Sequence, residues 1–182
     1  KLPSINYFHE LASHLDIETS ELTWLTYERR EGTVDHYTRF TIPKRTGGTR
    51  TISSPKSSLR NIQKWILHSI LDKIPVHSKA MAFRPKVSIV DNASTHKNSK
   101  IVVRLDLEDF FPSITFPRIR GFFDSVGYNP GIATVLALIC SDSPKETNHH
   151  KSPNHYRSTG QRSLPQGACT SPALANLITR NL

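Results

Sequence analysis

The stretch VVRLDLEDFFPSI (residues 102–114) constrains the fold most strongly, because an apolar run with the pattern of a core strand ends in a cluster of acids. Over residues 101–107 the aliphatic side chains alternate, so four of them fall on one face of an extended chain. Carboxylates then follow at Asp106, Glu108 and Asp109. A carboxylate at the end of a core strand is either a structural partner, such as a cap or one half of an ion pair, or a metal ligand.

The chemistry of these acids suits a hard divalent cation. Mg²⁺ is bound by carboxylate and carbonyl oxygens, and phosphate oxygens usually complete its shell. A strand end can present the carboxylate of Asp106 and the backbone carbonyl of Leu107 to one ion. Glu108 and Asp109 are either solvated or cap the helix that follows. The stretch therefore predicts a metal ligand at Asp106.

The charge of the chain favours an anionic partner. Its 182 residues include 24 Lys and Arg against 15 Asp and Glu, which gives a net charge of +9. Between Arg29 and Lys64 there are nine basic residues and only two acids. Such clustering is typical of a nucleic-acid-binding face, whereas simple solubility needs no cluster. The two cysteines form no disulfide framework, and no secretory signal or long apolar run occurs, which predicts a cytoplasmic protein without membrane contact.

Local patterns predict a mixed α+β fold. Apolar periodicity predicts helices over residues 5–30, 57–74, 115–125 and 130–141, and a last helix with Ser171 as its N-cap. The runs YTRFTIP and TRTIS flank KRTGG and predict a hairpin, because glycine supplies the positive φ of a tight turn. Residues 76–100 are irregular and polar, and residues 141–163 are either a polar loop or a long hairpin.

Two further motifs are candidates for ligand binding. In LPQGACTSPALA, Gln166 offers a donor and an acceptor, and Gly167 allows a close approach of the backbone. The alternative is an ordinary turn before a helix. In IPKRTGGTR, Lys44 and Arg50 lie six residues apart across the glycine tip and are able to converge on a triphosphate. An exposed basic turn without a ligand is equally compatible with this pattern.

Taken together and in this order, the motifs resemble those of reverse transcriptases, most closely the bacterial retron type. VVRLDLEDFFPSI is similar to the motif with the first catalytic aspartate, and LPQGACTSPALAN to the motif that holds template and incoming nucleotide. IPKRTGGTRTISSP resembles the fingers hairpin, and LRNIQKWIL the helix after it. DNASTH fits the Asn-Ala-x-x-His pattern associated with retron enzymes, at Asn92, Ala93 and His96. The resemblance covers roughly residues 37–182.

The resemblance implies an α+β right-hand polymerase fold. Its expected parts are an N-terminal helical region (1–36), fingers with hairpin and helix (37–100), and a partial palm (101–182) with a polar insertion at about 141–163. The thumb is absent, and no Asp-Asp pair matches the Tyr-x-Asp-Asp motif that carries the family's other catalytic carboxylates. We therefore expect the fingers and first part of the palm of a longer polymerase, inactive as this stretch alone.

The implied reaction is RNA-templated DNA synthesis from dNTPs with two Mg²⁺ ions, or Mn²⁺ in their place. Asp106 would bridge both ions and the Leu107 carbonyl would hold one. The implied nucleotide-binding residues are Lys44 and Arg50 for the triphosphate, Gln166 and Gly167 for the nucleotide and template pair, and Phe111 as a gate against the ribose 2′-hydroxyl. The competing interpretation makes Phe111 a core residue and turns Phe110 toward the site.

The implied partners are a structured RNA that serves as template and primer, its DNA product, and an effector protein in antiphage defence. Asn92 and His96 would contact this RNA, unless His96 is a buried structural histidine. The alternatives are a group II intron or abortive-infection type polymerase, and a non-catalytic RNA-binding module of the same fold. A zinc site at His149, His150 and His155 is not favoured, because paired ligand spacing is missing.

Overall fold

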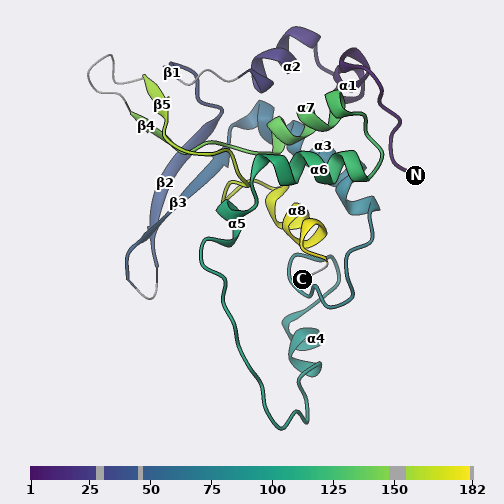
Figure 1. The fold of residues 1–182 in the computed structure, drawn as a ribbon, viewed down its shortest axis with the longest axis vertical. Coiled ribbons are helices and arrows are strands. Elements are labelled where there is room, and N and C mark those ends of the chain that lie inside the picture. The colour runs from purple at the N-terminus through teal and green to yellow at the C-terminus, as the bar shows by residue number, and fades with distance from the viewer. Residues whose placement is uncertain (28–30, 45–46, 148–154, 181–182) are drawn as a thin grey trace.

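The computed structural model describes residues 1–27, 31–44, 47–147 and 155–180 and shows a mixed α+β fold (Figure 1). Its helices are α1 (Phe8–Leu15), α2 (Thr19–Thr26), α3 (Ser57–Ser69), the 3₁₀ turn η1 (Leu71–Lys73), α4 (Ile89–Ser94), α5 (Phe110–Ser113), α6 (Phe116–Ser125), α7 (Pro130–Cys140) and α8 (Ser171–Ile178). Its strands are β1 (Glu31–Gly32), β2 (Tyr37–Pro43), β3 (Thr49–Pro55), β4 (Lys145–Thr147) and β5 (Tyr156–Ser158). The α+β class predicted from sequence is confirmed.

The core is built around α7, which α1, α2, α3 and α6 cover. Its sequence PGIATVLALIC is apolar on nearly every side, as expected of a helix buried on all faces. It contacts α1, α2, α3 and α6, while α8 packs against α6 and η1 (Figure 1). Asn129 caps α7 by accepting a hydrogen bond from the Ile132 backbone nitrogen at 3.1 Å. The predicted helices over 57–74, 115–125 and 130–141 are thus confirmed, and within the described residues no helix is long and apolar enough to cross a membrane.

The hairpin predicted around KRTGG is confirmed as the antiparallel pair β2–β3. Its register places Phe40 opposite Ile52 and Ile42 opposite Arg50. At the described edge of the tip, the Lys44 nitrogen donates to the Gly48 carbonyl at 3.0 Å. A second sheet has the order β1-β5-β4, so residues 141–163 form the long hairpin among the two alternatives, with a tip (148–154) outside the described residues.

Two local expectations need correction. The 5–30 region forms two helices, because Asp16 takes a left-handed conformation (φ 54°) that ends α1. The N-cap of α8 is Thr170, and Ser171 is the first helical residue. The hydroxyl of Ser171 donates instead to the Pro165 carbonyl at 2.8 Å.

The strand expected over residues 101–107 is wrong in this structure. The segment is extended but pairs with no described strand, and Ile101, Val103 and Leu105 are 81%, 76% and 87% exposed. It is the returning limb of an arm whose outgoing limb carries α4 (Figure 1). The alternating pattern describes one face of an extended chain, but a strand also needs a neighbour for its backbone groups and a cover for its apolar side.

A close contact joins the hairpin to the turn before α8. The Ser53 backbone nitrogen in β3 donates to the Gln166 carbonyl at 2.7 Å. The next residue, Gly167, has φ +114°, and a Cβ there would lie 2.8 Å from Ile52 Cγ2 and 2.9 Å from the Ser53 carbonyl oxygen. A side chain is therefore excluded at Gly167 both by backbone conformation and by space.

We expect Gly167→Ala to lower the free energy of unfolding by about 2–5 kcal/mol, the sum of left-handed strain and overpacking against β3. Gly127→Ala is the matched control, since Gly127 also has a positive φ (+106°) but no atom within 4 Å of an added Cβ. The control should lose only the conformational part, about 1–2 kcal/mol. Thermal and denaturant unfolding of both variants measures the difference, and equal losses would contradict the close packing at Gly167.

Candidate functional site

Backbone hydrogen bonds bring the three candidate motifs to one place. One link is the contact between Ser53 of the hairpin and Gln166 of the turn described above. On the other side of the turn, the Leu164 nitrogen donates to the Ile114 carbonyl at 3.0 Å, and residues 115 and 163 form a β-bridge. Ile114 closes the motif that begins with the exposed 101–107 segment. The turn is thus tied to the hairpin and to the base of the acidic motif.

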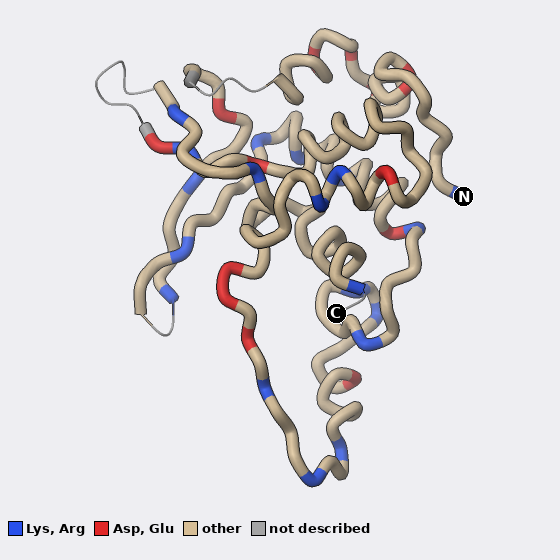
Figure 2. The backbone as a smooth tube through the Cα atoms, in the orientation of Figure 1, with Lys and Arg blue, Asp and Glu red and all other residues tan. Residues whose placement is uncertain are grey.

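The hairpin presents its two predicted phosphate ligands on one face. Residues directly opposite in an antiparallel pair share a face, so Arg50 lies on the side of Ile42, and Lys44 follows two residues later on that side. Ile52, the contact of Gly167, also belongs to this face. Lys44 and Arg50 are exposed, and Figure 2 shows cations along both strands. The structure therefore places Arg50 on the side of the hairpin that meets the glycine turn, and Lys44 directly follows the end of β2.

The acidic cluster lies on the surface, just before α5. Asp106, Glu108 and Asp109 are all exposed and follow one another along the chain in Figure 2. Asp109 occupies the N-cap position of α5 with φ +46°, but its side chain makes no capping hydrogen bond. Of the two structural roles considered for Glu108 and Asp109, solvation fits the structure better than capping.

The donor atoms at Asp106 suit a magnesium ion without forming a complete site. In the described part of the chain, no three His, Cys, Asp or Glu side chains gather as metal ligands. The Asp106 carboxylate and the Leu107 carbonyl are oxygen donors of the kind that Mg²⁺ takes, and Mg²⁺ commonly binds to one or two carboxylates together with substrate phosphates. The chemistry of the residues therefore fits the ion, and other oxygens must complete its shell.

The two phenylalanines of the motif have similar surroundings. Phe110 and Phe111 are both partly buried and both pack against the core, with ring centroids 5.8 Å apart at an interplanar angle of 59°. Burial does not separate a core ring from a ring at the site, so the gate at Phe111 stays a prediction. Gln166 is half-buried, and Gly167 is exposed at the turn.

Asn92 and His96 lie apart from these motifs. Asn92 is within α4, and His96 follows shortly after its end, so both belong to the arm (Figure 1). Ser88 and Asp91 form a capping box at the start of α4, with the Ser88 nitrogen 2.7 Å from Asp91 Oδ2. Both candidate residues are exposed, so the alternative of a buried structural histidine at His96 is wrong.

Sequence reasoning missed a buried residue, Gln63, that contacts the segment just after the glycine turn. Gln63 in α3 is fully buried and donates to the Tyr37 hydroxyl at 3.1 Å and to the Ile139 carbonyl at 2.9 Å. Its Oε1 accepts from Cys169 Sγ at 3.8 Å, next to the glycine turn. The available signal was a polar residue four positions after Leu59, on the apolar face of a predicted helix.

It also missed an ion network at the base of the hairpin. Arg39 of β2 bonds to the carboxylates of Asp35 and Asp142, and Lys145 Nζ lies 3.5 Å from Asp35 Oδ1. Burial raises the pKa of Asp142, and the positive charges of Arg39 and Lys145 partly offset the rise. Because Asp142 is 103 residues from Arg39 in sequence, no local pattern predicts the link between them.

Comparison with known proteins agrees with this arrangement. Residues 42–182 match the family described as "Reverse transcriptase (RNA-dependent DNA polymerase)". The whole chain is 38% identical to the retron Mx162 reverse transcriptase of Myxococcus xanthus over 181 residues, which is 37% of that protein. It is 35% identical to the retron Ec86 reverse transcriptase of Escherichia coli over 185 residues, 50% of that protein.

The matches extend over both the motif-bearing region and the N-terminal helices, since the two relatives cover all of this chain. The chain spans half or less of the length of these relatives. The region that this chain shares with its relatives contains the hairpin, the acidic motif and the glycine turn, and family membership rests on that region. The chain therefore belongs to the reverse transcriptase family and, within it, to the retron type.

Proposed function

We propose that this chain is the fingers and the first part of the palm of an RNA-directed DNA polymerase that copies a structured non-coding RNA into DNA. The observation that carries the proposal is the joint between the hairpin and the glycine turn, at Ser53 and Gln166, within a region that matches the reverse transcriptase family. This joint gives the cations of the hairpin and the turn a common side, on which an incoming dNTP lies between them.

In this proposal each group of the chain has one role toward the nucleotide. Lys44 and Arg50 bind the triphosphate, because two cations on one face match its charge. Gln166 and Gly167 pack on the nucleotide and its template partner, and the absence of a side chain at Gly167 allows the close approach. Phe111 lies beside the sugar and excludes a 2′-hydroxyl by its bulk.

The Asp106 carboxylate and the Leu107 carbonyl hold the metal ion in the complete enzyme. The chemistry that Mg²⁺ would supply there is activation of the primer hydroxyl and neutralisation of charge on the departing pyrophosphate. Residues 101–107 keep an uncovered aliphatic side in this structure, which the remainder of the palm covers in the longer protein. Asp106 is thereby fixed only when that part of the palm is in place, so the stretch alone is inactive.

The RNA partner contacts the arm at Asn92 and His96, which are exposed and free of the core. The excess of positive charge provides the sequence-independent part of RNA affinity. The similarity to retron enzymes supports this type over the group II intron and abortive-infection types. The proposal also includes an effector protein as a partner and a role in antiphage defence, both of which rest on the resemblance to retron enzymes.

The proposal predicts that Asp106→Asn in the full-length protein reduces DNA synthesis at least about 100-fold, because a charged ligand of the metal is lost. Folding should be unaffected, since Asp106 is exposed, and exposed substitutions usually change stability by less than about 0.5 kcal/mol. Asp109→Asn removes the same charge three residues later and should retain most of the activity. Primer extension on RNA, with melting curves for both variants, tests this role, and near-normal synthesis by Asp106→Asn would exclude it.

The proposal also predicts that Lys44→Ala and Arg50→Ala each raise the KM for dNTP about tenfold or more, since each removes a charge-assisted hydrogen bond to phosphate. Affinity for the RNA should change little. Lys56→Ala, an exposed cation at the opposite end of the hairpin, serves as the control and should leave both quantities unchanged. Loss of RNA binding at constant KM would show that the hairpin clamps the template instead.

For Phe111 we expect Phe111→Ala to admit ribonucleotides, with the largest change in the KM for rNTP and a smaller loss with dNTP. Phe110→Ala is the paired control, because the two rings have similar burial. Single-nucleotide incorporation with both sugars, beside a melting curve, separates the two roles. If Phe111→Ala costs about 3–5 kcal/mol of stability and leaves sugar selectivity unchanged, Phe111 is a core residue.

A further inference from the structure

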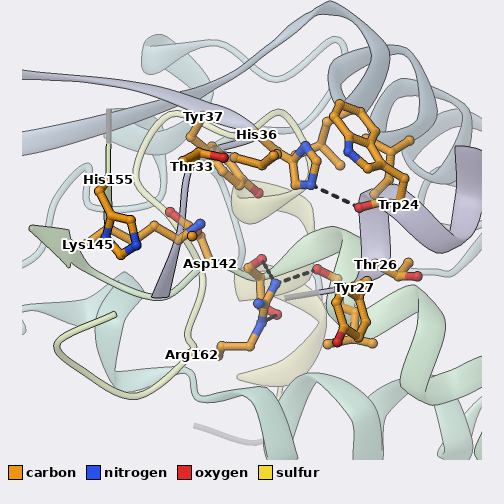
Figure 3. A pocket seen from close by; sticks show the side chains of 16 residues that line it. Trp24, Thr26, Tyr27, Thr33, His36, Tyr37, Asp142, Lys145, His155 and Arg162 are labelled. Atoms are coloured by element: carbon orange, nitrogen blue, oxygen red, sulfur yellow. Dashed lines mark hydrogen bonds between the residues drawn. The ribbon is translucent and has the colours of Figure 1, made fainter. Parts of the chain in front are cut away.

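Two hollows of similar volume differ in how their charged side chains are paired. The first, of about 460 Å³, lies at the end of α2 (Figure 3). Its lining residues Asp142 and Lys145 belong to the ion network described above. Arg162, also in its lining, donates to the Leu138 carbonyl at 2.8 Å. The second hollow, of about 440 Å³, lies between α6, the end of α8 and the residue after η1, and its cations are not held in this way.

The floor of this second hollow, called here the α6–α8 groove, is apolar. Phe122 and Val126 line it from α6, and Leu177 and Ile178 line it from the end of α8. Ile74 completes the floor next to η1. Except for the fully buried Leu177, these side chains are partly buried, so they pack against the core and also border the groove. Such a floor accepts an apolar side chain of a ligand.

Two arginines border the groove without a partner for their charge. Arg118 lies in the first turn of α6 and Arg180 follows the end of α8, and both are exposed. Among the described residues that line the groove there is no Asp or Glu. Neither guanidinium makes an ion pair or a hydrogen bond within the described part of the chain. By contrast Arg120, two residues after Arg118, donates from Nε to Thr134 Oγ1 of α7 at 3.0 Å.

A glycine inside α6 leaves one wall of the groove open. Gly121 and Phe122 follow Arg118 by three and four residues, so all three share one face of the helix. Gly121 lacks the positive φ that would require glycine, and an added Cβ would meet no atom within 4 Å. Glycine weakens a helix interior relative to alanine. Neither the backbone conformation nor the packing of the described chain explains this glycine, whereas close approach of a ligand explains it.

We propose that the α6–α8 groove docks an acidic segment of a partner protein. An apolar side chain of this segment lies on the floor, its carboxylates bind Arg118 and Arg180, and its backbone passes close to Gly121. A guanidinium binds a carboxylate through two parallel hydrogen bonds, which suits arginines that have no acid of their own. An apolar patch with arginine beside it is also typical of protein interfaces.

The apolar floor favours a protein segment over RNA. An RNA backbone would place phosphates over Phe122 and Ile178, and phosphates gain nothing from an apolar surface. The inference goes beyond the proposed polymerase function, because none of the residues assigned to the dNTP, the metal or the RNA lines this groove.

The test selects ligands of the full-length protein from a displayed library of random peptides. Peptides that also bind a Gly121→Trp variant are removed, since the indole fills the groove without removing any polar group from the chain. We expect the remaining peptides to carry Asp or Glu on both sides of a Leu, Ile or Phe. The proposal is overturned if no peptide remains, or if the peptides that remain lack acids.

Substitutions then assign the contacts of one selected peptide, with its dissociation constant measured by fluorescence anisotropy. Arg118→Ala and Arg180→Ala should each weaken binding about tenfold or more, because each removes a charge-assisted hydrogen bond. Arg120→Ala removes the same charge from the same helix outside the groove and should bind normally. Unchanged affinity in both Arg118→Ala and Arg180→Ala would show that the peptide binds elsewhere.

Gly121→Ala separates docking from stability. Alanine favours the helix and meets no atom of the described chain, so the melting temperature should rise while the affinity for the peptide falls. A purely structural role for Gly121 would give the reverse, a lower melting temperature with unchanged affinity, and would count against the proposal.

Two last measurements identify the class of partner and separate the groove from the polymerase site. A single-stranded RNA of random sequence should bind Arg118→Ala, Arg180→Ala and the unchanged protein equally. Loss of RNA affinity in both variants would make the groove an RNA surface and overturn the proposal. Lys44→Ala should bind the selected peptide normally, so failure of the proposed polymerase site and failure of this groove give different results.

Discussion

The hydrogen bond from the Ser53 nitrogen to the Gln166 carbonyl, with Gly167 pressed against β3, is the contact on which the proposed site depends. A two-stranded hairpin is marginal by itself in water. Here it gains a fixed attachment close to the middle of β3, and its exposed tip extends from there. The cations near the tip are thus carried at a defined distance from the turn. The absence of a side chain at Gly167 is therefore a structural requirement of this attachment, independent of the role proposed for Gly167 toward a nucleotide.

Two further groups of contacts keep this attachment rigid. Gln63 bonds to β2 through Tyr37 and to α7 through Ile139, so the hairpin and the helical core share one buried amide. Arg39 connects the base of the hairpin to Asp142 after α7. Removing one member of a buried ion network leaves its partners desolvated and unpaired, which is far more unfavourable than losing an exposed pair. Tyr37 and Arg39 lie on the same face of β2, and Ile52 meets Gly167 from the other face, so contacts hold the hairpin from both sides while its tip stays exposed.

The sequence predicted those elements whose signals are local. The hairpin was predicted from the glycines in its tip and the β-forming residues on both sides. The helices were predicted from apolar residues at helical spacing. Domain boundaries and the roles of Lys44, Arg50 and Asp106 stay predictions. The Arg39 network and Gln63 escaped prediction because their partners are remote in sequence. The strand predicted over residues 101–107 was wrong for a different reason, since an alternating pattern describes a single strand and a sheet requires at least two.

That failure also bears on how the site is assembled. The hairpin and the turn are already joined in this part of the protein, but Asp106 lies on a segment with no described neighbour and an exposed aliphatic side. Its connection to the joint is indirect, through α5 and the bonds between Ile114 and Leu164. The hairpin and the turn are therefore held together by direct contacts, whereas the acidic motif is attached only through its C-terminal end. A strand that paired with residues 101–107 would satisfy their backbone groups, cover their apolar face and fix the Asp106 carboxylate, so the proposed metal site would be fixed in the same step that completes the sheet.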